Sequence, residues 1–173
     1  GKRPEQITVN LLANGKVTDS QTVTAAGNWT YNFTDLPKYA EGKEIKYTVE
    51  EVKVADYTTE IDGYDIYNTH KPETTSISGT KTWDDANNQD GKRPESIIIN
   101  LLANGEKVDS QVVTADSNWK YSFKDLPVYK AGQKLTYTVS EENVKDYTTT
   151  YDGFNITNSY APGKTSATVV KVW

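Results

Sequence analysis

The sequence predicts an all-β protein made of two tandem β-sandwiches, and three observations lead to this fold class. Apolar and polar residues alternate along short segments, turn dipeptides separate these segments, and the whole pattern repeats after ninety residues. Alternation with a period of two places one face of each strand in a core and the other in water, as in antiparallel sheets. No long segment shows the wider spacing of an amphipathic helix.

The strands predicted in the first copy come at residues 6–11, 29–33 and 45–49, where every second side chain is apolar. Tight turns are expected between strands, because Asn, Asp and Gly tolerate the backbone conformations of hairpins. The turn dipeptides are Asn14-Gly15, Glu41-Gly42 and Asp62-Gly63, with counterparts at Asn104-Gly105, Ala131-Gly132 and Asp152-Gly153. About seven short strands in each copy favour a sandwich of the immunoglobulin-like type.

The boundaries of the repeats do not coincide with the ends of the chain. GKRPE at residues 1–5 recurs at residues 91–95, whereas residues 165–173 match residues 75–83 and so begin a third copy. The expected domains are residues 1–70, which lack their own first strand, residues 71–162, which are complete, and residues 163–173, the first strand of a further copy.

Repetition of this length indicates an array of small domains, which is typical of spacers, stalks and multivalent binders. Residues 69–75, which contain Pro72, are the expected linker between the two domains, and residues 161–163 are its counterpart. Both are short, so we expect them to restrict the relative orientation of neighbouring domains.

The composition bears on the class of partner. The 173 residues carry a net charge of −5 and contain no block of Lys or Arg, which disfavours nucleic acid. No apolar run reaches membrane-spanning length, so no membrane segment is expected. Cysteine is absent, so a small extracellular domain of this kind would need a cross-link other than a disulfide.

Three polar residues fall on the core-facing register of three strands. When the apolar alternation of each strand is extended by one step, it reaches Lys81, Glu141 and Asn158. An isolated charge in a core costs several kcal/mol, so such groups are normally paired. Desolvation also favours the neutral form of both charged side chains.

A neutral amine beside a protonated carboxyl and an amide is a reactive arrangement. The carboxyl donates a hydrogen bond to the amide carbonyl, the amine attacks the carbonyl carbon, and ammonia leaves, so that a Lys–Asn isopeptide bond forms. This hypothesis joins Lys81 to Asn158 and makes Glu141 the proton shuttle. The alternative from the pattern alone is a salt bridge between Lys81 and Glu141 at the open rim of the sandwich, with Asn158 nearby.

Several motifs resemble one known family. They are GTKTW at residues 79–83, YTVxE at 137–141, ITN at 156–158, the run at 83–94 and DLP at 125–127. Together they resemble the collagen adhesin B-repeat (CnaB) domains of Gram-positive surface adhesins, over essentially the whole chain. The resemblance implies an inverse immunoglobulin-like fold and, in many members, a self-formed isopeptide bond between the first and last strands. It also implies an extracellular location on a bacterial cell surface, in a cell-wall-anchored parent protein.

The first copy departs from this pattern. It holds Glu51 and Asn68 at the matching positions, but no lysine strand precedes Gly1, and the only candidate is Lys171, one period after Lys81. An open sheet edge is prone to association. We therefore expect the tail to dock into the first domain of the same or another chain, with a covalent Lys171–Asn68 link and Glu51 as the catalytic acid. The alternative is that the ends simply fall out of phase with the domains, which leaves the first domain open and the tail unpaired.

No metal, cofactor or small-molecule substrate is expected. Residues 84–91 are rich in Asp and Asn but do not fit the spacing of an EF-hand calcium loop, so a solvated loop is favoured. His70 is the only histidine, so one chain cannot build a histidine triad or a multi-histidine metal site. An enzyme with turnover is disfavoured, because the one reactive group of residues consumes itself.

The function expected from these observations is structural. The tandem domains form part of an extracellular stalk, with neighbouring repeats of the same protein as partners and isopeptide bonds as reinforcement. The alternative is a binding module that recognises a host protein or glycan through an exposed sheet face. Near-uniform repetition favours the stalk, since a binding face would concentrate unusual exposed aromatic residues in one copy.

Overall fold

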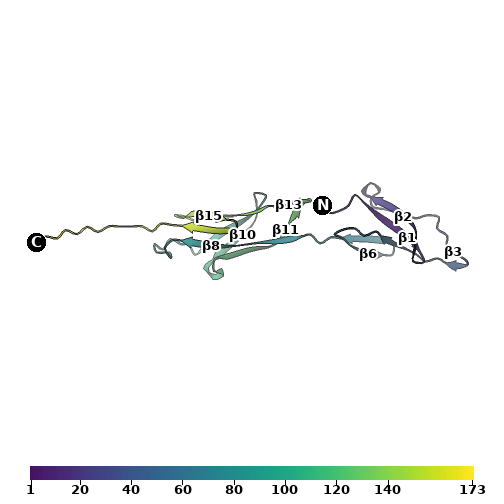
Figure 1. The fold of residues 1–173 in the computed structure, drawn as a ribbon, viewed down its shortest axis with the longest axis horizontal. Helices are drawn as coiled ribbons and strands as arrows, with labels where there is room; N and C mark the ends of the chain where they lie inside the picture. Colours follow the sequence, from purple (N-terminus) through teal and green to yellow (C-terminus); the bar gives the residue numbers. More distant parts are fainter. The chain divides into compact units, whose positions relative to one another are not determined.

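The computed structural model describes residues 1–173 and divides them into two compact units, unit 1 (Gly1–Pro72) and unit 2 (Glu73–Trp173). Nearly all regular structure is strand, and the helical elements are two 3₁₀ turns, η1 (Ala25–Gly27) and η2 (Ala115–Ser117) (Figure 1). The predicted all-β class is therefore confirmed. No helix of the structure has the length and apolar character that crossing a membrane requires.

Unit 2 is built from two main sheets. One has the strand order β11-β8-β16-β15, and the other has the order β10-β9-β14. The strands are β8 (Thr74–Asp84), β9 (Ser96–Ala103), β10 (Glu106–Thr114), β11 (Lys120–Pro127), β14 (Tyr137–Glu141), β15 (Thr148–Asp152) and β16 (Asn155–Ser159). A small hairpin of β12 (Tyr129–Lys130) and β13 (Gln133–Lys134) lies between β11 and β14 in the chain.

The core of unit 2 draws on both sheets. Buried apolar side chains alternate along β9 and β11, so the period-two pattern of the sequence marks the inner faces there. Each large apolar side chain taken from water in this way contributes about 1.5–3 kcal/mol. The buried cluster consists of Ile97, Ile99 and Leu101 of β9, Val113 of β10, Tyr121 and Phe123 of β11, and Ile156 of β16.

The first and last strands of unit 2 are neighbours. β16 pairs with β8 in parallel, with Ile156 opposite Lys81 and Ser159 opposite Asp84, whereas the other pairings of the two main sheets are antiparallel. Gly79 of β8 allows a close approach here, because a Cβ at this position would overlap the carbonyl oxygen of Phe154. This parallel pair positions the candidate site described below.

Unit 1 repeats only part of this architecture. Its three-stranded sheet has the order β2-β1-β5, and two small hairpins, β3-β4 and β6-β7, stand apart from it. The strands are β1 (Gln6–Ala13), β2 (Lys16–Thr24), β3 (Tyr39–Ala40), β4 (Lys43–Glu44), β5 (Tyr47–Glu51), β6 (Thr58–Asp62) and β7 (Asp65–Thr69). Its buried cluster contains Val9, Leu11, Val23 and Val49.

One predicted strand of unit 1 is wrong. Residues 29–33 form no strand, although the sequence alternates there, whereas residues 120–123, the counterparts of residues 30–33, lie in β11. β11 pairs with β8, and unit 1 has no strand at the place of β8. Alternation supplies a face to bury, but a strand also needs a partner for its backbone hydrogen bonds.

The connecting segments also differ in detail from the prediction. β7 ends at Thr69 and β8 begins at Thr74, so the expected linker at 69–75 overlaps strand at both ends. At the other end of unit 2, residues 160–173 form no strand, and residues 163–173 are exposed (Figure 1). We call residues 164–173 the tail.

Candidate functional site

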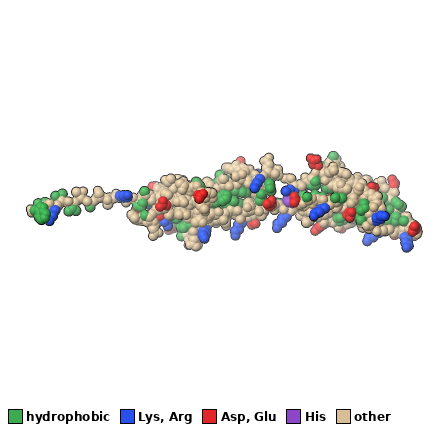
Figure 2. All heavy atoms as spheres, viewed as in Figure 1, with side chains coloured by type: hydrophobic (Ala, Val, Ile, Leu, Met, Phe, Trp, Pro, Cys, Tyr) green, Lys and Arg blue, Asp and Glu red, His purple; other side chains and the backbone are tan.

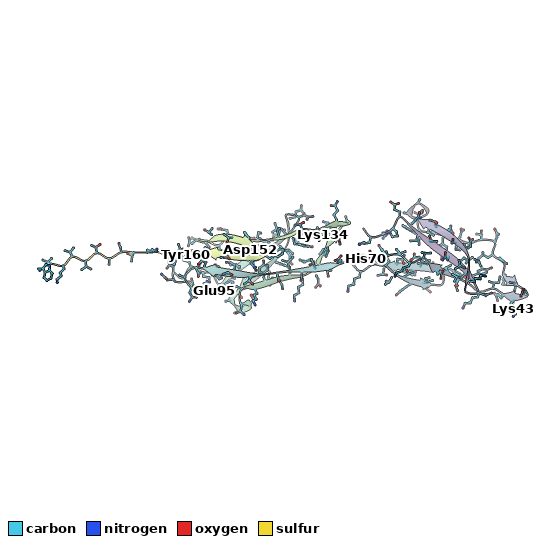
Figure 3. The ribbon with its side chains drawn as sticks, viewed as in Figure 1. Lys43, His70, Glu95, Lys134, Asp152 and Tyr160 are labelled. Atoms are coloured by element: carbon cyan, nitrogen blue, oxygen red, sulfur yellow. The ribbon has the colours of Figure 1, made fainter.

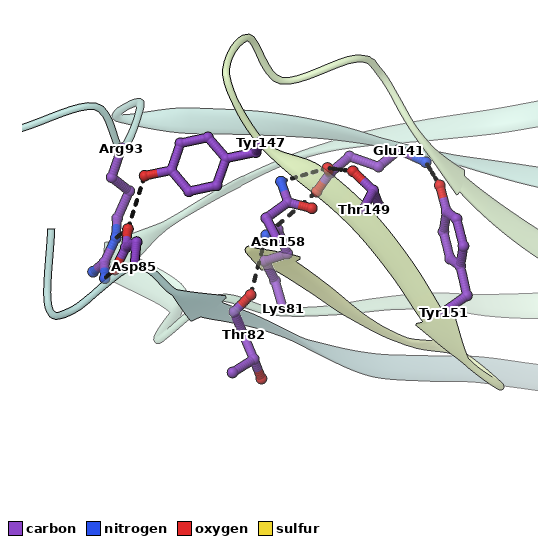
Figure 4. Close-up of polar contacts among 9 residues, drawn as sticks. All are labelled: Lys81, Thr82, Asp85, Arg93, Glu141, Tyr147, Thr149, Tyr151 and Asn158. Carbon is purple, nitrogen blue, oxygen red and sulfur yellow. Dashed lines mark hydrogen bonds and ion pairs between the residues drawn. The ribbon is translucent and has the colours of Figure 1, made fainter. Parts of the chain in front are cut away.

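Lys81, Glu141 and Asn158 meet inside unit 2 (Figure 4). They come from β8, β14 and β16, and so from both sheets of the sandwich. Lys81 Nζ lies 3.6 Å from Glu141 Oε2, with both side chains 0 % exposed, and the Asn158 amide donates a 2.7 Å hydrogen bond to Glu141 Oε1. The three residues predicted from the register are therefore brought together. Lys81 and Glu141 form the ion pair of the alternative interpretation, but it is buried and does not lie at an open rim.

The lysine amine is buried against an aromatic ring. Its Nζ is 3.6 Å from the centroid of the Trp83 ring and donates a 3.2 Å hydrogen bond to the carbonyl of Thr82. Burial lowers the pKa of Lys81 to about 8, against the opposing attraction of the Glu141 carboxylate. At neutral pH about one amine in ten is then unprotonated, compared with roughly one in several thousand for a lysine in water.

The carboxylate of Glu141 is held from two sides. Thr149 of β15 donates a 3.1 Å hydrogen bond to Oε1, the same oxygen that accepts from Asn158. Glu141 Oε2 and Asn158 Oδ1 are buried and have no hydrogen-bond partner. One carboxylate oxygen therefore orients the amide, and the other faces the amine.

The polarity of the Glu141–Asn158 contact differs from the prediction. The sequence argument had the carboxyl donate to the amide carbonyl, but in the structure the amide nitrogen donates to the carboxylate. An ionised carboxylate can only accept hydrogen bonds. The reactive arrangement requires a proton on Glu141 and a half-turn of the Asn158 amide, which turns Oδ1 toward the carboxyl.

A second polar cluster, with a buried carboxylate at its centre, lies beside the lysine, and the sequence analysis did not predict it. Asp85 accepts hydrogen bonds from Arg93 at 2.6 and 3.0 Å and from the Tyr147 hydroxyl at 2.8 Å. The bonds from Arg93 lower the pKa of Asp85 to about 2, and burial with the Asp85 contact raises the pKa of Tyr147 to about 12. The expectation of a fully solvated loop is wrong for Asp85, which is 2 % exposed.

Asp85 follows Lys81 and Trp83 in the same alternation of every second residue. Asp85 lies two residues beyond Trp83, so one more step of the alternation would have found it. The Arg93 guanidinium lies 5.4 Å from the Trp83 ring, and its positive charge adds to the lowering of the pKa of Lys81. No group of three or more His, Asp or Glu side chains is placed to hold a metal ion.

Unit 1 holds a similar carboxylate–amide pair without an amine. Asn68 donates a 2.8 Å hydrogen bond to Glu51, and the Thr59 hydroxyl lies 2.9 Å from Glu51 and 2.8 Å from Asn68. Lys171 is exposed on the tail, where its ammonium lies 3.3 Å from the centroid of the Trp173 ring. The structure therefore joins Glu51 to Asn68 but does not bring Lys171 to them.

Comparisons with known proteins agree on one family. The family model described as Cna protein B-type domain matches residues 1–69 and 77–159. A collagen adhesin of Staphylococcus aureus is 54 % identical over 180 residues, which cover 100 % of this chain and 15 % of that protein. The chain thus spans a small part of this relative.

Solved structures give the same result. The crystal structure of two B repeat units (B1B2) of the collagen binding protein of S. aureus matches with a TM-score of 0.84 and 52 % identity, over 94 % of this chain and 45 % of that chain. A single B repeat unit (B1) of the collagen binding surface protein of S. aureus matches with a TM-score of 0.50 and 46 % identity, over 93 % of this chain and 90 % of that chain.

Proposed function

The chain belongs to the family of Cna protein B-type domains, and from this premise we propose that it forms part of an extracellular stalk on a bacterial surface adhesin, hardened by Lys–Asn isopeptide bonds. The observation that carries the proposal is the enclosed group in unit 2 in which Glu141 of β14 contacts Lys81 of the first strand and Asn158 of the last strand. Buried ionisable groups of this kind are costly unless they are paired or have a chemical task.

The proposed reaction needs no cofactor and balances within the three side chains. The unprotonated Nζ of Lys81 attacks Cγ of Asn158 while the protonated Glu141 donates a hydrogen bond to Oδ1, which stabilises the charge that develops there. Glu141 then moves a proton from the attacking nitrogen to the departing Nδ2. The Cγ–Nδ2 bond breaks, ammonia leaves, and a Cγ–Nζ amide remains.

The bond would suit a load-bearing domain. It joins β8 to its parallel neighbour β16 near the Asp84 and Ser159 ends of both strands. The loop that it closes includes most of unit 2, which by the chain-entropy argument used for disulfides contributes about 4–5 kcal/mol to stability. A pulling force applied to the first and last strands would then pass through a covalent bond and bypass most of the sheet.

The binding-module alternative receives no specific support. Tyr39 and Tyr129 are both exposed, at 57 % and 43 %, and they occupy equivalent positions of the two copies. Tyr64 and Tyr67 of unit 1 are exposed as well, at 59 % and 57 %, but they line the open cleft of unit 1, which has no counterpart of β8, and do not form a face of a complete sheet. The collagen binding in the names of the relatives is a property of those longer proteins, and the present chain spans 15 % of the collagen adhesin.

The test of the proposal is the intact mass of the purified chain. The bond in unit 2 lowers the mass by one ammonia, and proteolysis should release a branched peptide that contains Lys81 and Asn158. Lys81→Ala removes the amine and should restore the full calculated mass of that variant. A wild-type chain with full mass and no branched peptide would overturn the proposed reaction.

A further inference from the structure

Two positively charged side chains lie at the same aromatic ring in unit 2. Lys81 Nζ is 3.6 Å and the Arg93 guanidinium carbon is 5.4 Å from the centroid of the Trp83 ring. Both distances fall within the range of about 6 Å over which an aromatic ring attracts a cation. Like charges repel, so a guanidinium in this place disfavours the charged form of the Lys81 amine.

Arg93 is held at the ring by a buried carboxylate. Asp85 is 2 % exposed, and it accepts hydrogen bonds from Arg93 Nε at 3.0 Å and from an Arg93 Nη at 2.6 Å. Two parallel bonds of this kind fix the plane of a guanidinium as well as its position. The Tyr147 hydroxyl donates a 2.8 Å hydrogen bond to the same carboxylate. Asp85 therefore keeps the positive charge of Arg93 beside Trp83.

The turn that joins Asp85 to Arg93 has an unusual backbone. Ala86, Asn87 and Asn88 have positive φ angles of 51°, 59° and 59°, in the left-handed region that residues with a Cβ disfavour. The Asn88 backbone N–H donates a 2.9 Å hydrogen bond to Asp85, and Asn88 Oδ1 accepts a 3.0 Å bond from the Arg93 backbone N–H. Such a backbone persists only where its surroundings enforce it, and it is common at functional sites. Here the turn returns the chain so that Arg93 reaches the end of β8.

Aromatic packing fixes the Trp83 ring between these groups. The ring lies edge-on to the rings of Trp119 and Tyr147, whose centroids are 5.2 and 5.0 Å away. The Tyr147 ring lies in turn 5.6 Å from the ring of Tyr160, just beyond β16 (Figure 3). A ring packed on more than one side keeps a constant distance to both cations.

Three charged groups act on the Lys81 amine. Burial is the main cause of its low pKa, and its ion-pair partner Glu141 opposes this effect. Arg93 lowers the pKa of Lys81 further, and Asp85 raises it by less than Arg93 lowers it. The Tyr147 hydroxyl is neutral, because burial raises its pKa to about 12. Elsewhere, side chains of both charges are interspersed over the surface seen in Figure 2, where water and salt screen them.

We propose that Arg93 is a positioning residue for the isopeptide reaction, which acts at the shared Trp83 ring to favour transfer of the Lys81 proton to Glu141. The inference rests on the proposed function. In the ion pair the single proton lies on Nζ, and in the reactive form it lies on the carboxyl oxygen 3.6 Å away. Arg93 neither gains nor loses a proton in this step. The neutral amine then attacks Cγ of Asn158, and ammonia leaves as described above.

The proposal predicts a specific pH dependence. Below about pH 8 the Lys81–Glu141 pair holds one proton, and the rate depends on how often that proton lies on Glu141. Without the charge of Arg93, the pKa of Lys81 rises, so the rate below pH 8 falls and its decline begins at higher pH. A pKa change of one unit gives a factor of about ten in the rate. At high pH the two rates converge, because the amine is then neutral in both chains.

Refolding of unreacted chain recovered from inclusion bodies tests this prediction by intact mass. Arg93→Gln removes the charge and keeps a donor for Asp85. It should lose ammonia about tenfold more slowly than wild type at pH 7, and at the wild-type rate near pH 10. Arg93→Lys keeps the charge without the planar fork, so its rate at pH 7 should stay within about threefold of wild type. Lys92→Gln is the matched control, because Lys92 is 48 % exposed and pairs with Asp146; it should change neither rate.

The partner carboxylate provides a variant with the opposite effect. Asp85→Asn removes a negative charge near the amine and keeps an oxygen that accepts from Arg93. It should lose ammonia about threefold faster than wild type at pH 7, and its decline should begin at lower pH. A general loosening that lets water reach Lys81 would instead move the decline to higher pH in both variants. Opposite shifts in Arg93→Gln and Asp85→Asn therefore identify an effect of charge.

The results separate this inference from the proposed function. A wild-type chain that never loses ammonia would overturn the reaction itself. If wild type reacts, but Arg93→Gln is equally fast or is slower by the same factor at pH 7 and pH 10, the reaction stands and the role of Arg93 is wrong. If tryptophan fluorescence shows that Arg93→Gln does not fold, Asp85→Asn decides. A rate for Asp85→Asn that is unchanged or slower at pH 7 would then overturn the inference.

Discussion

The Asn158 amide donates a 2.7 Å hydrogen bond to Oε1 of Glu141 in the interior of unit 2. The other carboxylate oxygen, Oε2, lies 3.6 Å from Lys81 Nζ. One side chain thus contacts both reactants, each through a different oxygen. This division suits a proton shuttle, since the amine that must lose a proton and the amide nitrogen that must gain one both lie against the same carboxyl group.

Replacement of the carboxyl should leave a folded but unlinked unit. Glu141→Gln keeps the size of the side chain but cannot move protons, so we expect bond formation to slow by about 10²–10⁴-fold. Intact mass after refolding measures the reaction. Glu142→Gln is the matched control, because this neighbouring carboxylate is 55 % exposed and pairs with Lys107. A cross-link in Glu141→Gln at the control rate would refute the assigned role.

Bond formation should depend on pH through the amine of Lys81. Burial lowers the pKa of this amine to about 8, and the unprotonated form is the nucleophile. Unreacted chain, recovered unfolded from inclusion bodies and refolded by dilution, should react more slowly as pH rises above about 8, because the Lys81–Glu141 pair then loses the single proton that the proposed reaction places on Glu141. The reaction is followed by mass as ammonia is lost. A rate that does not fall up to pH 10 would indicate a solvated amine.

Thr149 should act as a positioning residue. Its hydroxyl donates to Glu141 Oε1, and Thr59 makes the equivalent contact with Glu51. Thr149→Val keeps the shape but removes a hydrogen bond worth about 1 kcal/mol, so we expect a rate loss of roughly fivefold to tenfold. Thr149→Ser should restore the rate. If Val and Ser variants react equally, the hydroxyl has no part in positioning.

Acid should weaken unit 2 through Asp85. Its pKa is lowered to about 2 from 3.8 by the bonds from Arg93. The associated stability, about 2 kcal/mol, is therefore fully present above pH 3.8 and is lost as pH falls through 2. Urea unfolding at pH 5 and pH 2.5 measures this loss. Asp85→Asn should be less stable at pH 5 and should lose less on acidification; an unchanged pH dependence would contradict the assignment.

Gly79 should be required where β8 approaches β16, because an added Cβ at this position would overlap the Phe154 carbonyl oxygen. Gly79→Ala should therefore destabilise unit 2 by about 1–3 kcal/mol, the usual cost of overpacking. Gly27→Ala is the control, because nothing lies within 4 Å of its added Cβ. Equal melting temperatures for the two variants would show that the backbone around Phe154 yields freely.

The repeat and the alternation allowed much of the fold and the site to be predicted. Ile156 and Asn158 lie two residues apart on β16 and are both buried. Counting every second residue along the strands was therefore enough to predict the three members of the site. It could not show that Thr149 reaches Glu141, because β15 and β14 belong to different sheets. The count also could not predict which of Asn158 and Glu141 donates the hydrogen bond between them, because this depends on whether Glu141 carries a proton.

The sequence by itself determined the all-β class, the ninety-residue period and the inward register of Lys81, since these follow from local chemistry and counting. Only the tertiary structure decided which alternating segments become strands. Residues 29–33 and their counterparts in β11 have the same pattern, yet only β11 has β8 beside it to complete its hydrogen bonds. A segment becomes a strand only when a second segment pairs with its backbone N–H and C=O groups. The parallel pairing of β8 with β16 brings together two segments that lie far apart in the chain.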